Sequence, residues 1–301
     1  MITLTPPSGK LEAKLWAFEP FINFSMTRKN YETRIAETGD EVLGAMRLRH
    51  QVFYKEMLGK QKPSGLDADP FDFICDHLII RRVDTGETIG TYRLNPSSRN
   101  RRFYAAGEFW IANIQKLPGI KLEVGRACIH PEHRNGLVIT LLWKGMMEYF
   151  RRSGASWLFG CSSLATTDSR EAVDAYRRLA PGHLSPKETR VFPLPGKGVP
   201  HFNHFLKLKN RAEVAVEPSS EIEKRSALLL AYLRAGAKIC GKPVLDRMFR
   251  CVDFFTLLDA RDLSDSYEKK FFSAKPLGVT EAEEVAGADA RRRVQLNPVA
   301  P

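Results

Sequence analysis

The chain has 301 residues, and 43% of them are hydrophobic, so it can bury a sizeable core and is not a disordered chain by composition. Its formal net charge of +11 favours an acidic partner such as nucleic acid, an anionic membrane surface or an acidic protein. The sequence shows no zinc-type cysteine pair, no recognition-helix signature and no aromatic RNA-binding motif, so we do not expect nucleic acid as the partner.

Cysteine usage and the N-terminal residues indicate the compartment. The 5 cysteines form no CxxC pair and no even-numbered framework, which fits a reducing environment. Residues 1–14 show no basic region followed by an apolar run, and no segment approaches the ~18 apolar residues of a spanning helix. We expect a cytoplasmic protein, and peripheral contact with the inner membrane stays open.

Residues 1–30 are expected to form an N-terminal arm. Its segment Leu15–Phe24 is apolar and aromatic but is broken by Pro20, and it either packs on the core or lies at a membrane interface. Asp40 is expected to cap the first helix after the arm. Alternation and helical periodicity predict strands over 31–36, 77–83, 88–94, 122–130 and 157–161, and helices over 40–57, 137–152 and 169–179.

The C-terminal part of the chain continues the mixed pattern. Residues 181–212 are expected to be loop-like and basic, Ser220–Glu223 forms a capping box that opens a helix, and Cys251–Leu258 is predicted as a final strand. Strands and helices intermix, so we expect one α/β domain over 31–272, with an extension from about residue 181, and a disordered tail over 273–301.

Residues 120–134 form the most informative stretch of the sequence. They are predicted as a strand that ends in a loop with Arg134, and a helix whose start could hold a phosphate follows at once. This order is the layout of an acyltransferase core. Two further motifs accompany it: Arg49-His-Gln-Val-Phe53 near the end of a predicted helix, and Gly90-Thr-Tyr-Arg-Leu94 in a predicted strand.

Together these motifs resemble the GNAT-like acyltransferases that use acyl carrier protein. The acyl-homoserine-lactone synthases carry Arg-x-x-Val-Phe, Asp-x-x-Asp, Gly-x-x-Arg-Leu and Glu-x-x-Arg, which stand here at Arg49–Phe53, Asp69–Asp72, Gly90–Leu94 and Glu123–Arg126. The chain is more similar to the ornithine Nα-acyltransferases of ornithine-lipid synthesis, over roughly residues 31–272. The most specific match is the string Glu123-Val-Gly-Arg-Ala-Cys-Ile-His-Pro131.

The resemblance implies a central mixed, mostly antiparallel sheet flanked by helices. It also implies transfer of a long, 3-hydroxylated fatty acyl group from acyl carrier protein to the α-amine of ornithine, which yields lyso-ornithine lipid. No cofactor is expected beyond the phosphopantetheine of the carrier protein, and no metal, because His130 and His133 lack further ligands. Within this class the acceptor could instead be glutamine or the product a homoserine-lactone-like signal. Outside it, the rival is a non-catalytic basic module that binds membrane or nucleic acid.

Glu123 and its neighbours are the candidate catalytic residues. An amino-acid amine is mostly protonated at neutral pH, and Glu123 could accept its proton directly or through a water. Otherwise it forms a salt bridge with Arg126. In an extended strand these two side chains point to opposite faces, unless a bulge near Gly125 also frees N–H groups for an oxyanion. Cys128 is a third candidate through an acyl-enzyme, although a buried strand cysteine is the ordinary explanation.

The amino-acid acceptor needs a cation for its carboxylate and, if its side chain is basic, an acid for its second amine. In the homoserine-lactone synthases the matching residues form an ion-pair network at the site. A purely structural network is the alternative. The candidate substrate-binding residues are Arg49, Asp69, Asp72, Asp76 and Arg93.

The loop Arg134-Asn-Gly136 is the candidate binding site for the acyl donor. Acetyl-CoA enzymes of this fold usually show a loop richer in glycine, and phosphopantetheine carries one phosphodiester and no pyrophosphate, so the sparse loop favours a carrier protein. Carrier proteins are acidic, and the basic residues Lys144, Arg151 and Arg152 on the following helix could dock one. A solvated helix face is the alternative.

Overall fold

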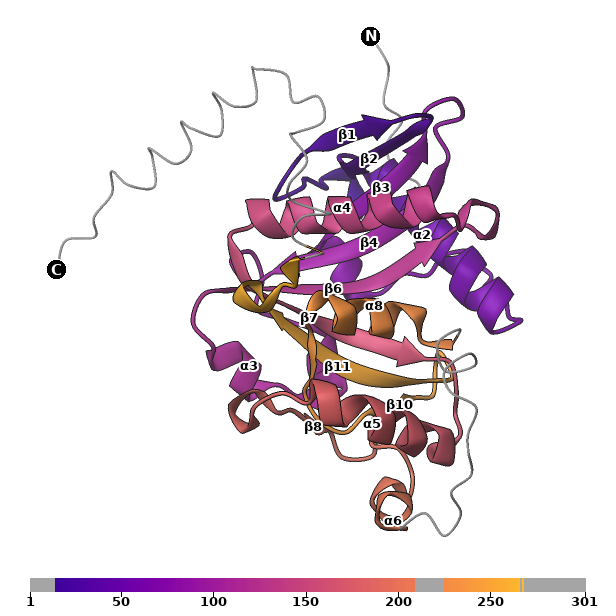
Figure 1. Ribbon diagram of the computed structural model, residues 1–301. Coiled ribbons are helices and arrows are strands. Elements are labelled where there is room, and N and C mark those ends of the chain that lie inside the picture. Colours follow the sequence, from indigo (N-terminus) through magenta and orange to yellow (C-terminus); the bar gives the residue numbers. More distant parts are fainter. Residues whose placement is uncertain (1–13, 209–224, 266, 268–301) are drawn as a thin grey trace, which may run out of the picture.

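The computed structural model describes residues 14–208, 225–265 and 267, and in this part of the chain a nine-stranded sheet runs through the molecule (Figure 1). The described strands pair antiparallel throughout the sheet, except that β6 and β7 are parallel. In spatial order the strands are β1 (Ser25–Arg28), β2 (Tyr31–Ile35), β3 (Asp76–Arg82), β4 (Thr88–Pro96), β6 (Ile120–Ile129), β7 (Ala155–Leu164), β11 (Cys251–Asp259) and β10 (Val244–Asp246), and β9 (Lys238–Ile239) also pairs with β11.

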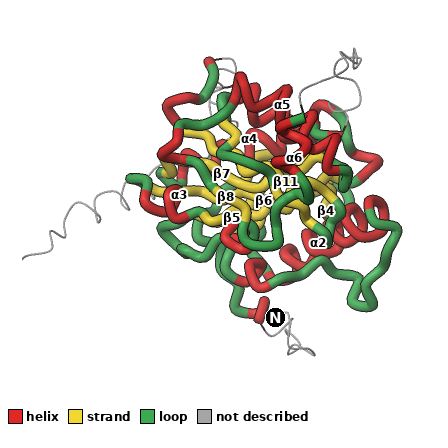
Figure 2. The backbone as a smooth tube through the Cα atoms, turned by 90° about the horizontal axis from the view of Figure 1, so that it is seen from below, coloured by secondary structure: helices red, strands yellow, loops and turns green. Residues whose placement is uncertain are grey.

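Helices cover both faces of this sheet. The helix α4 (Gly136–Arg152) packs on one face and α2 (Gly39–Arg49) on the other, so the strands lie between them in Figure 2. The remaining helices are α3 (Ala112–Lys116), α5 (Ser169–His183), α6 (Phe202–Lys207) and α8 (Ala227–Ala235). Short 3-10 turns are η2 (Pro70–Phe73), η3 (Tyr104–Gly107), η4 (Pro131–His133), η5 (Lys187–Thr189) and η6 (Ala260–Asp262), and β5 (Phe109–Trp110) pairs with β8 (Phe192–Pro193) in a small second sheet.

The spacing of apolar residues along the strands and helices explains how the two hydrophobic clusters form, one on each face of the sheet. On β3, Leu78 and Ile80 pack in the cluster under α4, whereas Ile79 between them packs in the cluster under α2. On α4, Val138 and Leu142 are buried in that first cluster at the spacing of one helix face. The central strands are therefore apolar on both faces, as the mixed fold requires.

The two parallel strands at the centre separate along their length. The pairing of β6 with β7 runs from Ile120 to Glu123, although both strands continue well beyond it. Gly160 marks the point of separation, because a Cβ there would lie 2.3 Å from the carbonyl oxygen of Val124. Past this point the gap between β6 and β7 widens into a cavity.

A bulge re-aims β6 beside this cavity. Thr91 of β4 lies opposite Cys128 and Arg93 lies opposite Gly125, so two steps on β4 face three on β6. Arg126 is the extra residue and has a φ of 54°, in the left-handed region that side chains rarely adopt. The bulge that the sequence analysis required for Glu123 and Arg126 to share a face is therefore present.

The expected fold class is confirmed, and several boundaries differ. Thr38, not Asp40, caps α2, because its hydroxyl accepts the Glu41 N–H, and after Arg49 this helix widens into the π-helical segment η1 (His50–Met57). The predicted loop over 181–212 contains the end of α5, β8 and α6. The capping box at Ser220–Glu223 and the tail over 273–301 lie outside the described residues.

The end of the expected N-terminal arm is part of the sheet, since β1 pairs with β2. Leu15 and Phe24 are buried, while Trp16 and Phe21 between them are about half exposed. This segment therefore packs on the core through its two ends. Of the helices in the described part of the chain, none has the length and apolarity to cross a membrane.

Candidate active site

The cavity between β6 and β7 has a volume of about 480 Å³ and brings together five of the predicted site residues, including all three catalytic candidates. Its walls come from the bulged half of β6, the separated half of β7, the π-helical segment η1 and the turn after β10. Of the predicted residues, Arg93, Glu123, Arg126, Cys128 and Arg134 line it. Beyond Glu123 the β7-facing edge of β6 borders this cavity, so its backbone groups are available to a bound molecule.

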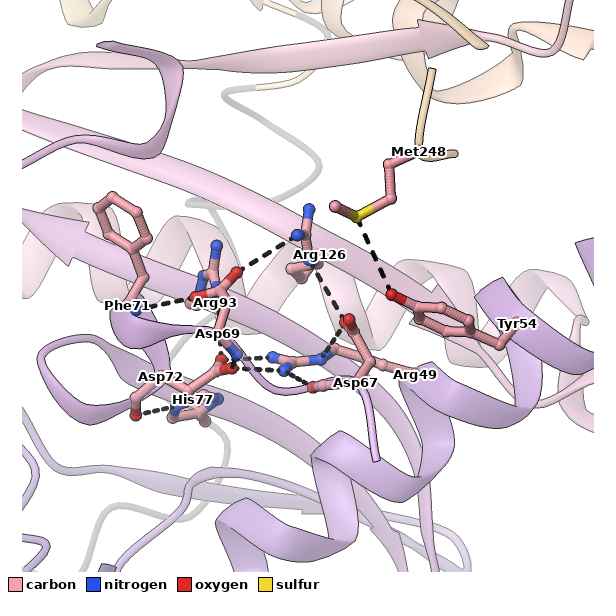
Figure 3. A network of polar contacts seen from close by, with 10 residues as sticks. All are labelled: Arg49, Tyr54, Asp67, Asp69, Phe71, Asp72, His77, Arg93, Arg126 and Met248. Carbon is pink, nitrogen blue, oxygen red and sulfur yellow. Dashed lines mark hydrogen bonds and ion pairs between the residues drawn. The ribbon is translucent and has the colours of Figure 1, made fainter. Parts of the chain in front are cut away.

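A network of buried arginine and aspartate side chains adjoins the cavity (Figure 3). Arg49 binds Asp72 through two hydrogen bonds of 2.8 Å, and it also contacts the carboxylate and the carbonyl of Asp67. Burial alone would raise the pKa of Asp72, but the guanidinium groups of Arg49 and Arg93 hold it well below its usual range. The carbonyl of Asp72 meets Nε2 of His77, whose pKa burial lowers to about 4. Apart from Arg93, these side chains pair with one another, do not line the cavity and therefore support the site without reaching it.

Two arginines of the network, Arg93 and Arg126, line the cavity. Arg93 donates to Asp69 at 2.7 Å and to Asp72 at 3.1 Å, whereas Arg126 meets Asp67 and Asp69 only at 3.3 Å. The guanidinium of Arg126 also lies over two aromatic rings, at 4.7 Å from that of Tyr104 and 4.8 Å from that of Phe249. Arg126 has the longest ion pairs of the network and lines the cavity, so it is the arginine best placed to receive a carboxylate.

Glu123 lies beside Arg126 in the cavity wall but does not pair with it. Its two carboxylate oxygens accept the backbone N–H groups of Tyr104 and Ala105, each at 2.8 Å. Burial raises the pKa of Glu123 to about 7, and the two backbone hydrogen bonds oppose this rise. The alternative of a salt bridge to Arg126 is therefore wrong, and Glu123 is a buried carboxylate poised near neutral pH.

The thiols do not support an acyl-enzyme. Burial raises the pKa of Cys128 to about 12 and that of Cys161 well above its usual value, so both are neutral at physiological pH. Cys128 packs against Leu48 and Val52 in a small apolar cluster. The ordinary explanation for Cys128, a buried strand cysteine, agrees with this geometry.

Asp76 is separated from the other predicted acceptor residues. It is fully buried, and its carboxylate accepts the N–H groups of Phe21 and Ile22, the hydroxyl of Tyr149 and the guanidinium of Arg99. Asp76 therefore fastens the N-terminal arm to the sheet and to α4. It does not line the cavity.

The donor residues are divided between two places. Arg134 lies at the cavity, where it binds Glu56 at 2.5 and 2.6 Å and donates to the carbonyl of Ile129, and Gly136 begins α4 directly after it. Arg151 and Arg152 both bind Glu148 at the other end of α4, which is about 25 Å long at 1.5 Å per residue. The docking stripe of Lys144, Arg151 and Arg152 on α4 stays a prediction, and two of its three cations are paired with Glu148.

Several cavity residues were missed by sequence reasoning. Asp67 completes the arginine network, and Tyr104 and Phe249 stack on Arg126. Asp246 and Asp253 also line the cavity. An available signal was Asp253 itself, a charged residue between the apolar Val252 and Phe254, whereas nothing in the sequence placed it near β6.

A mostly antiparallel sheet whose two parallel central strands separate around a cavity, with a carboxylate at the point of separation, defines an acyltransferase of the GNAT class. The family model described as an acetyltransferase (GNAT) domain matches residues 48–144.

The comparison with known sequences narrows the class. A protein of Rhizobium meliloti named L-ornithine N(alpha)-acyltransferase is 30% identical over 79% of this chain and 83% of its own length. Proteins of the same name from Brucella abortus and Rhodobacter capsulatus are 30% and 28% identical, over 78% and 83% of this chain and 86% and 97% of their own lengths. The chain belongs to the L-ornithine Nα-acyltransferase family.

Solved structures with similar topology include acyl-homoserine-lactone synthases. The synthase LasI is 11% identical, with a TM-score of 0.47 over 84% of this chain and 100% of that one. The CoA-dependent synthase BjaI is 14% identical, with a TM-score of 0.45 over 83% of this chain and 92% of that one. Likeness at this level carries no argument about the reaction.

Proposed function

We propose that this acyltransferase moves a long-chain 3-hydroxyacyl group from acyl carrier protein to the α-amine of ornithine, and so makes lyso-ornithine lipid. The observation that carries the proposal is that Glu123 and Arg126, three residues apart on β6, both line the cavity between β6 and β7. A carboxylate that can take a proton thus lies beside a cation that can hold an amino acid by its carboxylate. The names of the relatives supply the identity of the amino acid.

In the proposed reaction the thioester lies along the separated edge of β6. The neutral amine attacks the thioester carbon, the new C–N bond forms, and the C–S bond breaks. Glu123 accepts the proton that the attacking amine loses and passes it to the departing phosphopantetheine thiolate, which leaves as the thiol. Backbone N–H groups beside the bulge stabilise the oxyanion, and the fixed position of the acceptor supplies the approach.

Two features of the cavity support acyl carrier protein as the proposed donor. Arg134 stands there as one cation beside a loop with a single glycine, which suits the one phosphodiester of phosphopantetheine. The apolar wall from η1, with Val52, Phe53 and Met57, suits a long acyl chain. We place the enzyme in the cytoplasm, with reversible contact to the inner membrane where its product is needed. No resident cofactor takes part.

Expression in a bacterium that makes no ornithine lipid tests the proposal. Extracted lipid should contain a new ninhydrin-positive species whose mass equals that of ornithine plus a 3-hydroxy fatty acid minus one water. The control is the Glu123→Gln variant at the same protein level. No new lipid from the wild type, or a product with another amino acid, would contradict the proposed function.

A further inference from the structure

A cluster of carboxylates and thiols lies mostly on β10, β11 and β7, in and behind the cavity wall. One ligand atom each from Glu108, Cys161 and Asp253 lie within 4.8 Å of one another, and the same holds for Asp246, Cys251 and Asp253. Asp246 and Asp253 line the cavity, and Glu108 stands behind them, in contact with Cys161. The three acidic residues are 9%, 4% and 6% exposed in that order.

Within residues 14–208, 225–265 and 267 no cation lies at ion-pair distance from these carboxylates, and only Lys197 and Arg126 act on Glu108 and Asp253 from farther away. Glu108 accepts only the thiol of Cys161, at 3.4 Å, which leaves one of its oxygens without a donor. Asp253 accepts the hydroxyl of Ser163 at 2.6 Å and a weak thiol contact through the same oxygen, so its other oxygen is also without one. Asp246 is held by two backbone N–H groups through a single oxygen. The arginine network beside the cavity, by contrast, matches three arginines with three aspartates.

Buried carboxylates that lie close together are costly in the charged form, because each is removed from water beside a like charge. Burial and the neighbouring carboxylates raise the pKa of Glu108 to about 8 and that of Asp253 to about 6, so Glu108 is mostly protonated at neutral pH while the site is empty. A bound cation would relieve both effects. The oxygens that lack donors are the acceptors such a cation needs.

We propose that Asp246 and Asp253, backed by Glu108, bind the side-chain ammonium of a diamino-acid acceptor whose α-carboxylate faces Arg126. This inference rests on the proposed function and deepens it. An ammonium offers three donors, which suits a group of carboxylate oxygens with room for them. The residue that links the two ends is Phe249, whose backbone N–H binds Asp246 and whose ring lies under Arg126.

An ammonium fits this site better than a divalent metal does. A metal would take its ligands from Cys161 or Cys251, and burial raises the pKa of both thiols far from that of a ready thiolate. The opposite charges of Arg126 and of this acidic cluster suit a ligand that is anionic at one end and cationic at the other. Amino acids with neutral side chains would leave the acidic wall unpaired, which is a strong basis for discrimination.

The test compares ornithine with norvaline, which is the same amino acid without the side-chain amine. The wild type should show a kcat/KM at least ~100-fold higher for ornithine. Asp253→Asn should lower kcat/KM for ornithine ~10- to 100-fold and change that for norvaline less than threefold. Asp259→Asn, on the same strand but paired with Arg261 outside the cavity, is the matched control and should change neither. Equal use of both acceptors by the wild type, or an equal loss of both in Asp253→Asn, would overturn the inference.

Calorimetric titration without any acyl donor separates this inference from the proposed function. Ornithine should bind the wild type at least tenfold more tightly than norvaline, and Asp253→Asn or Glu108→Gln should remove the difference. If no donor supported acylation but this difference remained, the proposed function would fail and the ammonium site would stand. Tight zinc binding at the cluster, with ornithine binding lost on chelation, would replace the ammonium site by a metal site. The Glu108→Gln variant serves if Asp253→Asn does not fold.

Discussion

At the scale of single residues, Glu123 tests whether the site uses a general base. Glu123→Gln removes the basicity and should lower kcat/KM ~100- to 10,000-fold, the usual contribution of such a base. Glu123 also holds the first N–H groups of η3, so a loss of rate alone would not distinguish a base from a support. The pH profile does: the wild type should show a limb that rises through about pH 7, the pKa of Glu123, and the variant should lack it. A loss below threefold with the fold intact would place amine deprotonation elsewhere.

Asp72 tests the buried network. Asp72→Asn removes the carboxylate that binds Arg49 through two hydrogen bonds and also pairs with Arg93, and should cost ~3–5 kcal/mol of unfolding free energy in denaturant titration. Asp84→Asn, which breaks the exposed pair with Arg82, is the control and should change stability very little. Equal stabilities of the two variants would mean that the network contributes nothing.

The sign of the pH effect follows from the depressed pKa of Asp72. Its ordinary value is 3.8, so its stabilisation is complete above that pH and is lost as the pH falls below it. Wild-type stability should therefore drop more steeply than that of Asp72→Asn below about pH 4. The same acid slope in both proteins would contradict the assigned pairing.

At the scale of elements, the bulge on β6 makes two predictions about Arg126. Because its φ is 54°, Arg126→Ala keeps a strained backbone, whereas Arg126→Gly should be more stable than the alanine variant by ~1 kcal/mol. Both variants should raise KM for ornithine at least tenfold, since both remove the guanidinium. Denaturant unfolding and steady-state kinetics measure the two effects. A lower stability of the glycine variant, or an unchanged KM, would contradict the geometry.

The elements also show how far sequence reasoning reaches. Local patterns predicted the strand over 122–130 and the helix over 137–152, because alternation and helical periodicity depend only on residues that are close in the sequence. The sequence also predicted that the side chains of Glu123 and Arg126 share a face of the strand only if a bulge lies between them. The widening of the helix at His50 and the approach of Asp246 and Asp253 to β6 were not, because both depend on contacts between segments far apart in the chain.

At the scale of the whole molecule, the net charge of +11 predicts reversible binding to anionic vesicles. Each Lys or Arg near such a bilayer contributes ~1 kcal/mol, and salt screens the attraction. Sedimentation with vesicles should show binding at low salt and release at high salt. Binding that resists salt would indicate apolar insertion, for which the exposed pair Trp110 and Phe192 across β5 and β8 is better placed than the buried Leu15 and Phe24. Loss of that binding in Trp110→Ala would identify the insertion site.

The central claim is that one cavity joins an acyl thioester to the α-amine of a diamino acid. The most direct measurement is mass spectrometry of the product made by purified enzyme from 3-hydroxyacyl-acyl carrier protein and an equimolar mixture of ornithine, norvaline and glutamine. We predict Nα-(3-hydroxyacyl)ornithine as the dominant product, with far less of it when acyl-CoA replaces the carrier protein. A dominant norvaline or glutamine product, or acylation on the side-chain amine of ornithine, would contradict the account.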